Sequence, residues 1–385
     1  MKTPAAVRTQ RGFTLVELMV AVVIGLVVTL AASGIVIRGE STRRVTTSAN
    51  DVGQNGSYLA YTLDKAIRSA GSGFVQTWRS TFGCTLRVAR AGATILPRGN
   101  AFPAPFAALP HTVRMAPVVI HAGAGADGSD VLQVMTGNAG FGEAPAPVLT
   151  GSVTASSVRL RNTLGLRGND LMLLVEDGQG CIVQQVEATF VGGLADLLPF
   201  AGAYAAATVD GVDLASLGVA NPLQSLQLGS ASAANPPLFQ LYGVGADDTL
   251  FAYDLLRLAN GDRPLPMAEG VATLRALYGV DTNDDGLVDA WVAADAAPWD
   301  AASLLDGSVA ARDNLRRILA VRVALVLRST LVEKDVVAPA ALPLFADLPG
   351  AVQASYAVAP ALQQRRHRAL EFTVPLRNLL LLPNV

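Results

Sequence analysis

The sequence predicts an α+β fold, in which one long N-terminal helix packs on an antiparallel β-sheet head. Residues 13–37 are almost wholly apolar, and residues 38–70 repeat apolar side chains at spacings of three and four. The remainder alternates short β-type segments with turns rich in glycine and proline. With 385 residues, of which 51% are hydrophobic, the chain is long enough to bury a sizeable core.

Composition and motifs argue against several classes of function. The 29 lysines and arginines are balanced by 31 aspartates and glutamates, and the net charge of −2 gives no electrostatic footprint for nucleic acid. The sequence contains no GxxxxGK[ST] phosphate loop and neither a GxSxG nor an HExxH motif. Its three histidines, His111, His121 and His367, are scattered, so we expect them in loops or on the surface. We therefore expect no catalytic residues and no nucleic-acid partner.

The first forty residues combine a basic segment with an apolar run of membrane length. Lys2, Arg8 and Arg11 precede residues 13–37. As a helix this run would rise about 37 Å, enough to cross the hydrocarbon core of a bilayer. Its single acid, Glu17, would cost roughly 2.5 to 3.5 kcal/mol at membrane depth and therefore needs a partner. The alternative is a carboxylate that snorkels to the headgroups.

Residues 11–18, RGFTLVEL, resemble the class III signal of type IV prepilins and pseudopilins. The resemblance implies that a prepilin peptidase cuts between Gly12 and Phe13 and methylates the new Phe13 amine. It also implies that Glu17 pairs with the Phe13 amine of a neighbouring subunit. An α-amine has an unperturbed pKa of about 7.7 to 8.0, is free only after cleavage, and can neutralise a carboxylate in a dry helix bundle.

This resemblance also implies an organisation along the chain. Arg38, Arg43 and Arg44 balance the cations before the span, so the cytoplasmic N-terminus rests on the resemblance alone. The expected parts are a cytoplasmic leader peptide (1–12), a transmembrane and filament-core helix (13–37), a periplasmic amphipathic half of that helix (38–70) and a β-rich globular head (71–385).

Residues 38–70 are predicted to form a helix with one apolar stripe. Gly71 and Gly73 would end it. Such a stripe can pack on a sheet, and the alternative is an amphipathic helix lying on a membrane surface. The stripe consists of Val45, Ala49, Val52, Gly56, Leu59, Leu63, Ala66 and Ala70.

Strands are predicted throughout the head. Residues 192–238 are rich in alanine and glycine and are expected to form an irregular insertion. Residues 318–328 alternate apolar side chains with Arg322 and Arg328, as in a half-exposed strand. Residues 171–176 and 182–190 should form an antiparallel pair about the turn 177–180. The predicted strands are 118–120, 131–136, 171–176, 182–190, 250–258, 271–280, 318–328 and 370–377.

The two ends of the chain resemble PilW-type minor pilins. Residues 59–74 are similar to the end of the N-terminal helix in that family. Later, a Tyr-Gly-Val-Asp with an acidic loop, Trp299, the strand AVRVALVLRS and the segment 368–378 follow in the order of that family. Residues 80–250 contain no motif that resembles a known family.

The PilW resemblance implies a minor pilin that helps initiate type IV pilus assembly and sits at or near the pilus tip. Its implied location is the inner membrane, with a periplasmic head, and then the pilus on the cell surface. The implied partners are other minor pilins, the major pilin, the prepilin peptidase, the inner-membrane assembly platform and a tip adhesin. Twitching motility and cell adhesion are the processes expected to depend on it.

Two other functions stay open at this point. A J-type minor pseudopilin of a type II secretion system would share the leader, and the neighbouring genes would separate the two. A membrane-tethered adhesin or enzyme with a ligand site in the middle region belongs to another class. A pocket of convergent ionisable groups would favour the enzyme, and a broad exposed apolar patch would favour the adhesin.

The chain has two cysteines, Cys84 and Cys181, far apart and outside any CxxC spacing. This spacing argues against metal binding by thiolates. In an oxidising compartment the two would form one disulfide. The alternative is two buried, reduced thiols.

Residues 281–289, DTNDDGLVD, fit the pattern D-x-[DN]-x-[DN]-G of calcium-binding loops. The twelfth position is Val292 rather than an acid, which excludes a complete EF-hand. Four acids within nine residues would repel one another without a cation, so we expect Ca²⁺ as a cofactor. The alternative is an acidic surface turn. The expected ligands are Asp281, Asn283, Asp285, the carbonyl of Leu287 and Asp289.

Overall fold

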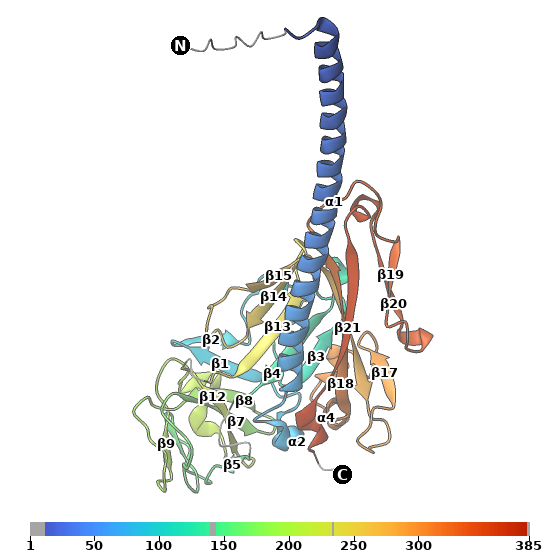
Figure 1. The fold of residues 1–385 in the computed structure, drawn as a ribbon. Coiled ribbons are helices and arrows are strands. Elements are labelled where there is room, and N and C mark those ends of the chain that lie inside the picture. The colour runs from blue at the N-terminus through green and yellow to red at the C-terminus, as the bar shows by residue number, and fades with distance from the viewer. Residues whose placement is uncertain (1–11, 139–143, 233–234, 383–385) are drawn as a thin grey trace, which may run out of the picture. The chain divides into compact units, whose positions relative to one another are not determined.

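The computed structural model describes residues 12–138, 144–232 and 235–382. The chain falls into two compact units, Met1–Asp51 and Val52–Val385. Helix α1 (Leu15–Arg68) contributes residues to both (Figure 1). The second unit consists largely of antiparallel strands, so the predicted α+β fold is confirmed.

The first unit presents an exposed apolar helix. Residues 12–36 are all exposed. By length and composition, Leu15–Val36 could cross a membrane, in agreement with the predicted span of residues 13–37. A helix with this much exposed apolar surface is suited to lipid or to other apolar helices rather than to water. The leader residues 1–11 lie outside the described residues.

In the second unit, the last part of α1 packs its apolar stripe into the head. Leu59, Leu63 and Ile67 are completely buried in the main core. A Cβ atom added to Gly56 would lie 2.6 Å from Leu327 Cδ1, so glycine allows the helix to approach the sheet closely. The predicted stripe is confirmed from residue 52 onward, while the side chains at positions 45 and 49 lie outside those described.

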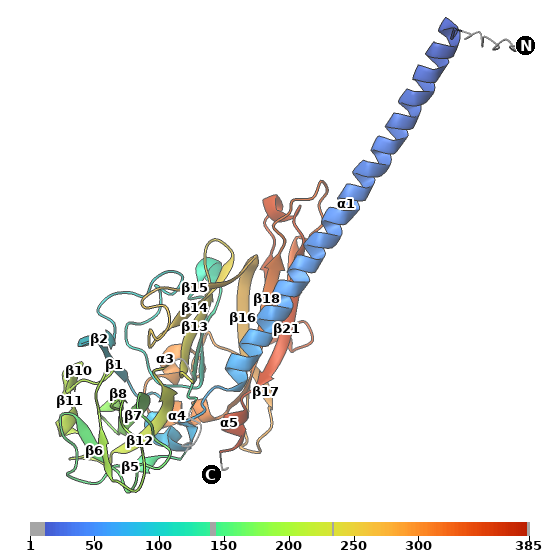
Figure 2. The same cartoon turned by 60° about the vertical axis from the view of Figure 1, so that its left-hand side comes forward.

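The sheet that α1 contacts has four antiparallel strands in the order β17-β16-β18-β21, and Figure 2 shows its central strands beside the helix. The predicted strands 271–280 and 318–328 are confirmed at both ends. The bounds are β16 (Val271–Val280), β17 (Ala290–Ala293), β18 (Ile318–Arg328) and β21 (His367–Pro375).

The expectation of a half-exposed strand at 318–328 was wrong, because β18 is buried on both faces. One face contributes Val321 and Val323 to the main core, and the other contributes Ala324 and Val326 to a small separate cluster. The hairpin of β19 (Ala341–Leu344) and β20 (Ala354–Ala357) contributes to that cluster. Alternation with arginine therefore did not indicate exposure.

A five-stranded antiparallel sheet, in the order β15-β14-β13-β4-β3, forms the next layer of the head. The predicted strands 118–120, 131–136 and 250–258 correspond to β3, β4 and β14. The bounds are β3 (Val118–His121), β4 (Val131–Thr136), β13 (Leu238–Val244), β14 (Thr249–Asp254) and β15 (Leu265–Glu269).

A six-stranded sheet in the order β2-β1-β8-β7-β12-β5 also belongs to the head, and among its described strands β1 and β8 pair in parallel while the other pairs are antiparallel. The predicted hairpin about residues 177–180 is confirmed, with Glu176 opposite Gly180. Strand β8 ends at residue 185 rather than 190. The bounds are β1 (Leu86–Arg90), β2 (Ala93–Leu96), β5 (Ala146–Pro147), β7 (Asp170–Glu176), β8 (Gly180–Gln185) and β12 (Gln224–Ser230).

The segment 192–238 is not the irregular insertion that its composition predicted. Strand β12 from this segment pairs with Asp170–Val175 of β7, with a bulge between Gln227 and Gly229, and carries Leu226 and Leu228 into the main core. Its other apolar residues, including Leu198 and Leu214, help to form a second core beneath the six-stranded sheet. The small elements are β6 (Ser157–Arg159), β9 (Leu197–Pro199), β10 (Thr208–Val209), β11 (Val212–Asp213), α2 (Trp78–Thr81), α3 (Ala301–Leu304), α4 (Val309–Arg316) and α5 (Arg377–Leu380).

Candidate functional site

The Gly12–Phe13 junction is exposed and lies just before α1. Phe13 is 88% exposed. No described atom lies within 4 Å of a Cβ built on Gly12, and its backbone is not in the left-handed region. Nothing in the described structure therefore requires glycine at position 12. A requirement for glycine at the junction must come from another protein that handles this segment, as the predicted peptidase would.

Thr14 and Glu17 form a capping box at the start of α1. The Thr14 N–H and hydroxyl donate to Glu17 Oε2 at 3.0 and 2.9 Å, and the Glu17 N–H donates to Thr14 Oγ1 at 3.3 Å. This arrangement satisfies backbone donors that a helix start leaves unpaired. Sequence reasoning missed the role of Thr14, although the T-x-x-E spacing was a sufficient signal. The pairing of Glu17 with a neighbour's amine stays a prediction.

The predicted disulfide is confirmed between Cys84 and Cys181, whose Cα atoms are 5.9 Å apart. Cys181 lies in β8, opposite Leu86 of β1. The bond therefore ties the segment after α2 to the six-stranded sheet, beside its one parallel strand pair.

The loop 281–289 uses its acids to organise its own backbone. The buried carboxylate of Asp281 accepts hydrogen bonds from the N–H groups of Asp284 at 2.7 Å and of Gly286 at 2.7 Å. Asp289 Oδ2 accepts from the N–H and the hydroxyl of Thr282, both at 2.8 Å. These bonds lower the pKa of Asp289.

The remaining side chains expected to bind calcium lie on the surface of this loop. Asn283 Nδ2 donates to Asp285 Oδ2 at 3.2 Å and lies 3.5 Å from Asp289 Oδ1. Among the residues that the structure describes, no group of three or more His, Cys, Asp or Glu side chains could hold a metal ion. Calcium binding stays a prediction.

Asp284, which was not among the expected ligands, joins this loop to the end of α4. Its carboxylate accepts from Arg316 Nη2 at 2.7 Å and from Arg317 Nη2 at 2.9 Å. The hydrogen bond from Arg317, followed by that from Arg316, lowers its pKa. The protein thus provides a partner for this acid, which weakens the argument that repulsion within the loop requires a cation.

The three histidines lie on different parts of the head, His111 in a loop, His121 at the end of β3 and His367 at the start of β21. His111 is exposed, but His121 is buried at the end of β3, where its ring lies 3.3 Å from Gln133 Oε1. The expectation of a surface or loop position was wrong for His121, since the sequence did not show how the sheets cover β3. Burial lowers its pKa to about 4, so the ring is neutral at physiological pH.

Two models of known protein families match the chain, one near each end. Residues 7–33 match the family model of the prokaryotic N-terminal methylation motif. Residues 241–378 match the PilW family model, described as type IV pilus-assembly protein W. This second match runs from β13 to α5 and includes the four-stranded sheet. No curated protein and no solved structure matched the chain.

An exposed apolar helix that begins at a methylation motif, and whose last part lies in the core of a β-rich head, is consistent with a membrane-anchored protein of the prepilin class. The match over the C-terminal part is to the PilW family. Together the two family-model matches support a PilW-type, prepilin-like protein of the type IV pilus.

Proposed function

We propose that this protein is a non-catalytic minor pilin that helps to initiate type IV pilus assembly and sits at or near the pilus tip. The observation that carries the proposal is that different parts of α1 have different environments. Residues 15–36 of the helix are apolar and exposed, whereas Leu59, Leu63 and Ile67 of the same helix form part of the core of the head. One helix thus provides a segment suited to a membrane or a filament core, and it also provides residues of the hydrophobic core of the head.

The size of the head supports a minor rather than a repeating subunit. The second unit extends from Val52 to Val385, and its described residues form three sheets of four to six strands. A head of this bulk is difficult to repeat at every position along a thin fibre, but a terminal position leaves it unhindered.

The proposed location is the inner membrane, with a single span and a periplasmic head, followed by the pilus tip. The Cys84–Cys181 disulfide supports an oxidising compartment for the head. Before assembly the partners would be the prepilin peptidase and the inner-membrane assembly platform. In the filament they would be other minor pilins, the major pilin and a tip adhesin.

Electron microscopy with gold-labelled antibody against the head would test the position. We expect label at one end of isolated pili and fewer pili per cell when the gene is deleted. Label spaced along the shaft would contradict a tip position, and an unchanged number of pili would contradict a role in initiation. Pili present in normal number together with lost protein secretion would instead indicate the J-type pseudopilin function.

A further inference from the structure

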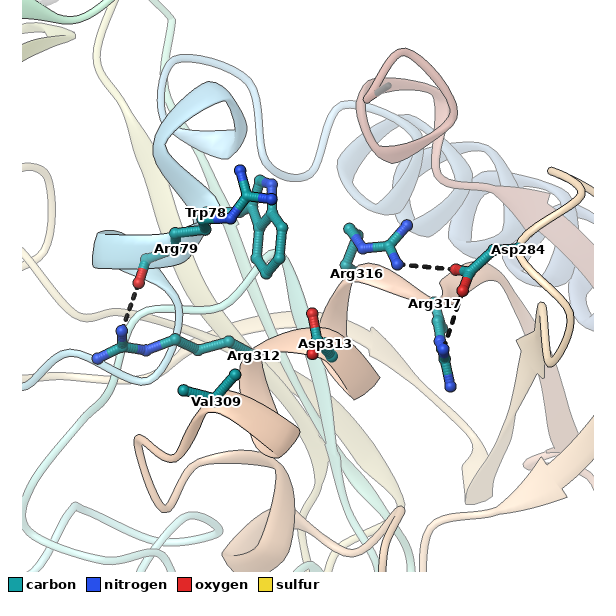
Figure 3. A pocket seen from close by; sticks show the side chains of 8 residues that line it. All are labelled: Trp78, Arg79, Asp284, Val309, Arg312, Asp313, Arg316 and Arg317. Atoms are coloured by element: carbon teal, nitrogen blue, oxygen red, sulfur yellow. Dashed lines mark hydrogen bonds and ion pairs between the residues drawn. The ribbon is translucent and has the colours of Figure 1, made fainter. Parts of the chain in front are cut away.

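A basic cavity of about 480 Å³ lies in the head where three segments meet (Figure 3). The segments are helix α2, helix α4 with the following Arg317, and the loop that follows β16. Four of the lining side chains are arginines and two are aspartates, which leaves a surplus of two positive charges. The charged residues are Arg79, Arg312, Arg316, Arg317, Asp284 and Asp313.

The ion pairs within the cavity leave part of this positive charge uncompensated. Arg316 and Arg317 share the single carboxylate of Asp284. Arg312 pairs with Asp177, 3.1 Å away and outside the cavity lining. One carboxylate therefore balances two guanidinium groups at the end of α4.

Arg79 is the most available cation of the group. It is exposed, and it forms no ion pair with any residue that the structure describes. Its guanidinium carbon lies over the Trp78 ring, 4.6 Å from the centroid. A guanidinium held on an aromatic face keeps N–H groups at its edge free to donate to a carboxylate.

A second cation, Arg316, also lies near the Trp78 ring. The guanidinium carbon of Arg316 lies 5.6 Å from the centroid of the same ring (Figure 3). Two like charges near one side chain repel each other, and an anion bound beside them would remove that repulsion. Asp313 on α4 faces the same cavity and offsets one positive charge, which limits the site to a small anionic group.

We propose that this cavity is a docking site for a glutamate or aspartate side chain of another polypeptide in the filament. A single carboxylate matches the small charge surplus. A polyanion would instead be repelled by the rest of the protein, whose net charge is −2. Trp78 and Val309, which is 72% exposed, provide an apolar wall for the methylene groups of such a side chain. Tryptophan and arginine, together with tyrosine, are enriched among the residues that contribute most to binding at protein interfaces.

The choice of a filament protein as the source of the carboxylate rests on the proposed function, but the chemistry of the site does not. A binding experiment on the purified full-length chain in detergent micelles tests that chemistry directly. The probe is a fluorophore-labelled peptide, acetyl-Ala-Leu-Glu-Leu-Ala-amide, and its binding is followed by fluorescence anisotropy. The matched peptide carries glutamine in place of glutamate.

We expect saturable binding of the glutamate peptide and at least tenfold weaker binding of the glutamine peptide. Arg79→Glu should weaken binding of the glutamate peptide at least tenfold, because it replaces the free cation with an anion. Arg79→Lys should retain part of the affinity. Arg90→Glu is the matched control, since Arg90 also lies over an aromatic ring, that of Tyr204, but is not among the residues that line the cavity.

Several results would overturn the proposal. These are equal affinity for the two peptides, an unchanged affinity in Arg79→Glu, and an equal loss of affinity in Arg90→Glu. Binding of inorganic phosphate as tight as that of the peptide would indicate a site for free anions instead. Because peptide binding is measured without pili, its failure would leave the pilin proposal standing. A protein that bound the peptide but never entered pili would disprove only the pilin proposal.

Discussion

The carboxylate of Glu17 is hydrogen-bonded to Thr14 of its own chain, through the Thr14 N–H at 3.0 Å and the Thr14 hydroxyl at 2.9 Å. The residue expected to neutralise a neighbour's amine thus also caps its own helix. A carboxylate has several acceptor positions and can do both. The two roles require different chemistry, since the cap needs an acceptor and the amine pairing needs a negative charge.

We predict that Glu17→Gln and Glu17→Ala will both be processed normally but will enter pili at least tenfold less than the wild type. Glutamine keeps a carbonyl oxygen for the cap but lacks the charge that pairs with an amine. Quantitative blotting of purified pili against total membrane protein measures the loss. Thr14→Ala, which removes the hydroxyl and keeps the charge, is the control. Rescue of incorporation by glutamine would show that capping, not charge, is the function of Glu17.

We predict that Gly12→Glu will block removal of the leader. A Cβ at position 12 meets nothing in the described structure, so the substitution should leave the fold intact and affect only the peptidase. Intact-mass analysis of membrane protein should show the full-length chain. Gly25→Ala, another position on the exposed helix where a Cβ meets nothing, should be processed normally. A mature chain beginning at Phe13 in the Gly12→Glu variant would refute the processing claim.

The disulfide should stabilise the head considerably, because it closes a long loop. Cys84 and Cys181 are 97 positions apart, and the entropy of a loop of this length in the unfolded chain favours a stabilisation of about 2 to 4 kcal/mol. Replacing both cysteines with alanine should lower the free energy of unfolding by that amount in denaturant titrations. Wild-type protein in reductant should match the variant. Full thiol labelling of the protein isolated from cells would mean that the bond does not form there.

We propose that the loop 281–289 binds Ca²⁺ and that calcium raises the melting temperature of the full-length protein in detergent. A fragment that begins at residue 71 is unsuitable for this measurement, because Leu59, Leu63 and Ile67 belong to the core of the head. The affinity should be modest, since no glutamate occupies the twelfth position.

Variants of this loop must separate loss of calcium from loss of structure. Asp281 is buried and accepts backbone hydrogen bonds, so its replacement would destabilise the loop with or without calcium. Asp285→Asn is the better test, because Asp285 is exposed and asparagine can keep its bond to the Leu287 N–H. It should abolish the calcium response, whereas Asp284→Asn should retain it. Identical melting in calcium and in chelator would leave an acidic turn.

Burial of His121 predicts a loss of stability in acid. Its pKa in the folded protein is lowered to about 4, below the ordinary value of 6.5. The folded state therefore binds this proton less readily than the unfolded state. Its full contribution is present above pH 6.5 and is lost as the pH falls toward 4, by about 3 kcal/mol. His121→Gln should flatten this part of the profile of unfolding free energy against pH, and an unchanged slope would contradict the assignment.

The N-terminal features could be predicted from the sequence because each depends on local pattern alone. An apolar run of membrane length, the RGFTLVEL signal and a stripe repeating every three or four residues require no knowledge of distant contacts. The strands 131–136, 271–280 and 318–328 were also predictable, since β-branched runs bounded by turns specify them locally. The disulfide followed from having only two cysteines.

The tertiary structure alone decided which surfaces are covered and which charges meet. Arg322 of β18 suggested an exposed face, but it pairs with Asp347 and Glu371, and a hairpin covers that side of the strand. Asp284 and Arg317 are 33 positions apart and yet form an ion pair that borders the basic cavity. Periodicity reports only the environment that a segment's own spacing requires. The partner of a buried charge depends on packing between segments that are distant in sequence, so the local pattern does not predict it.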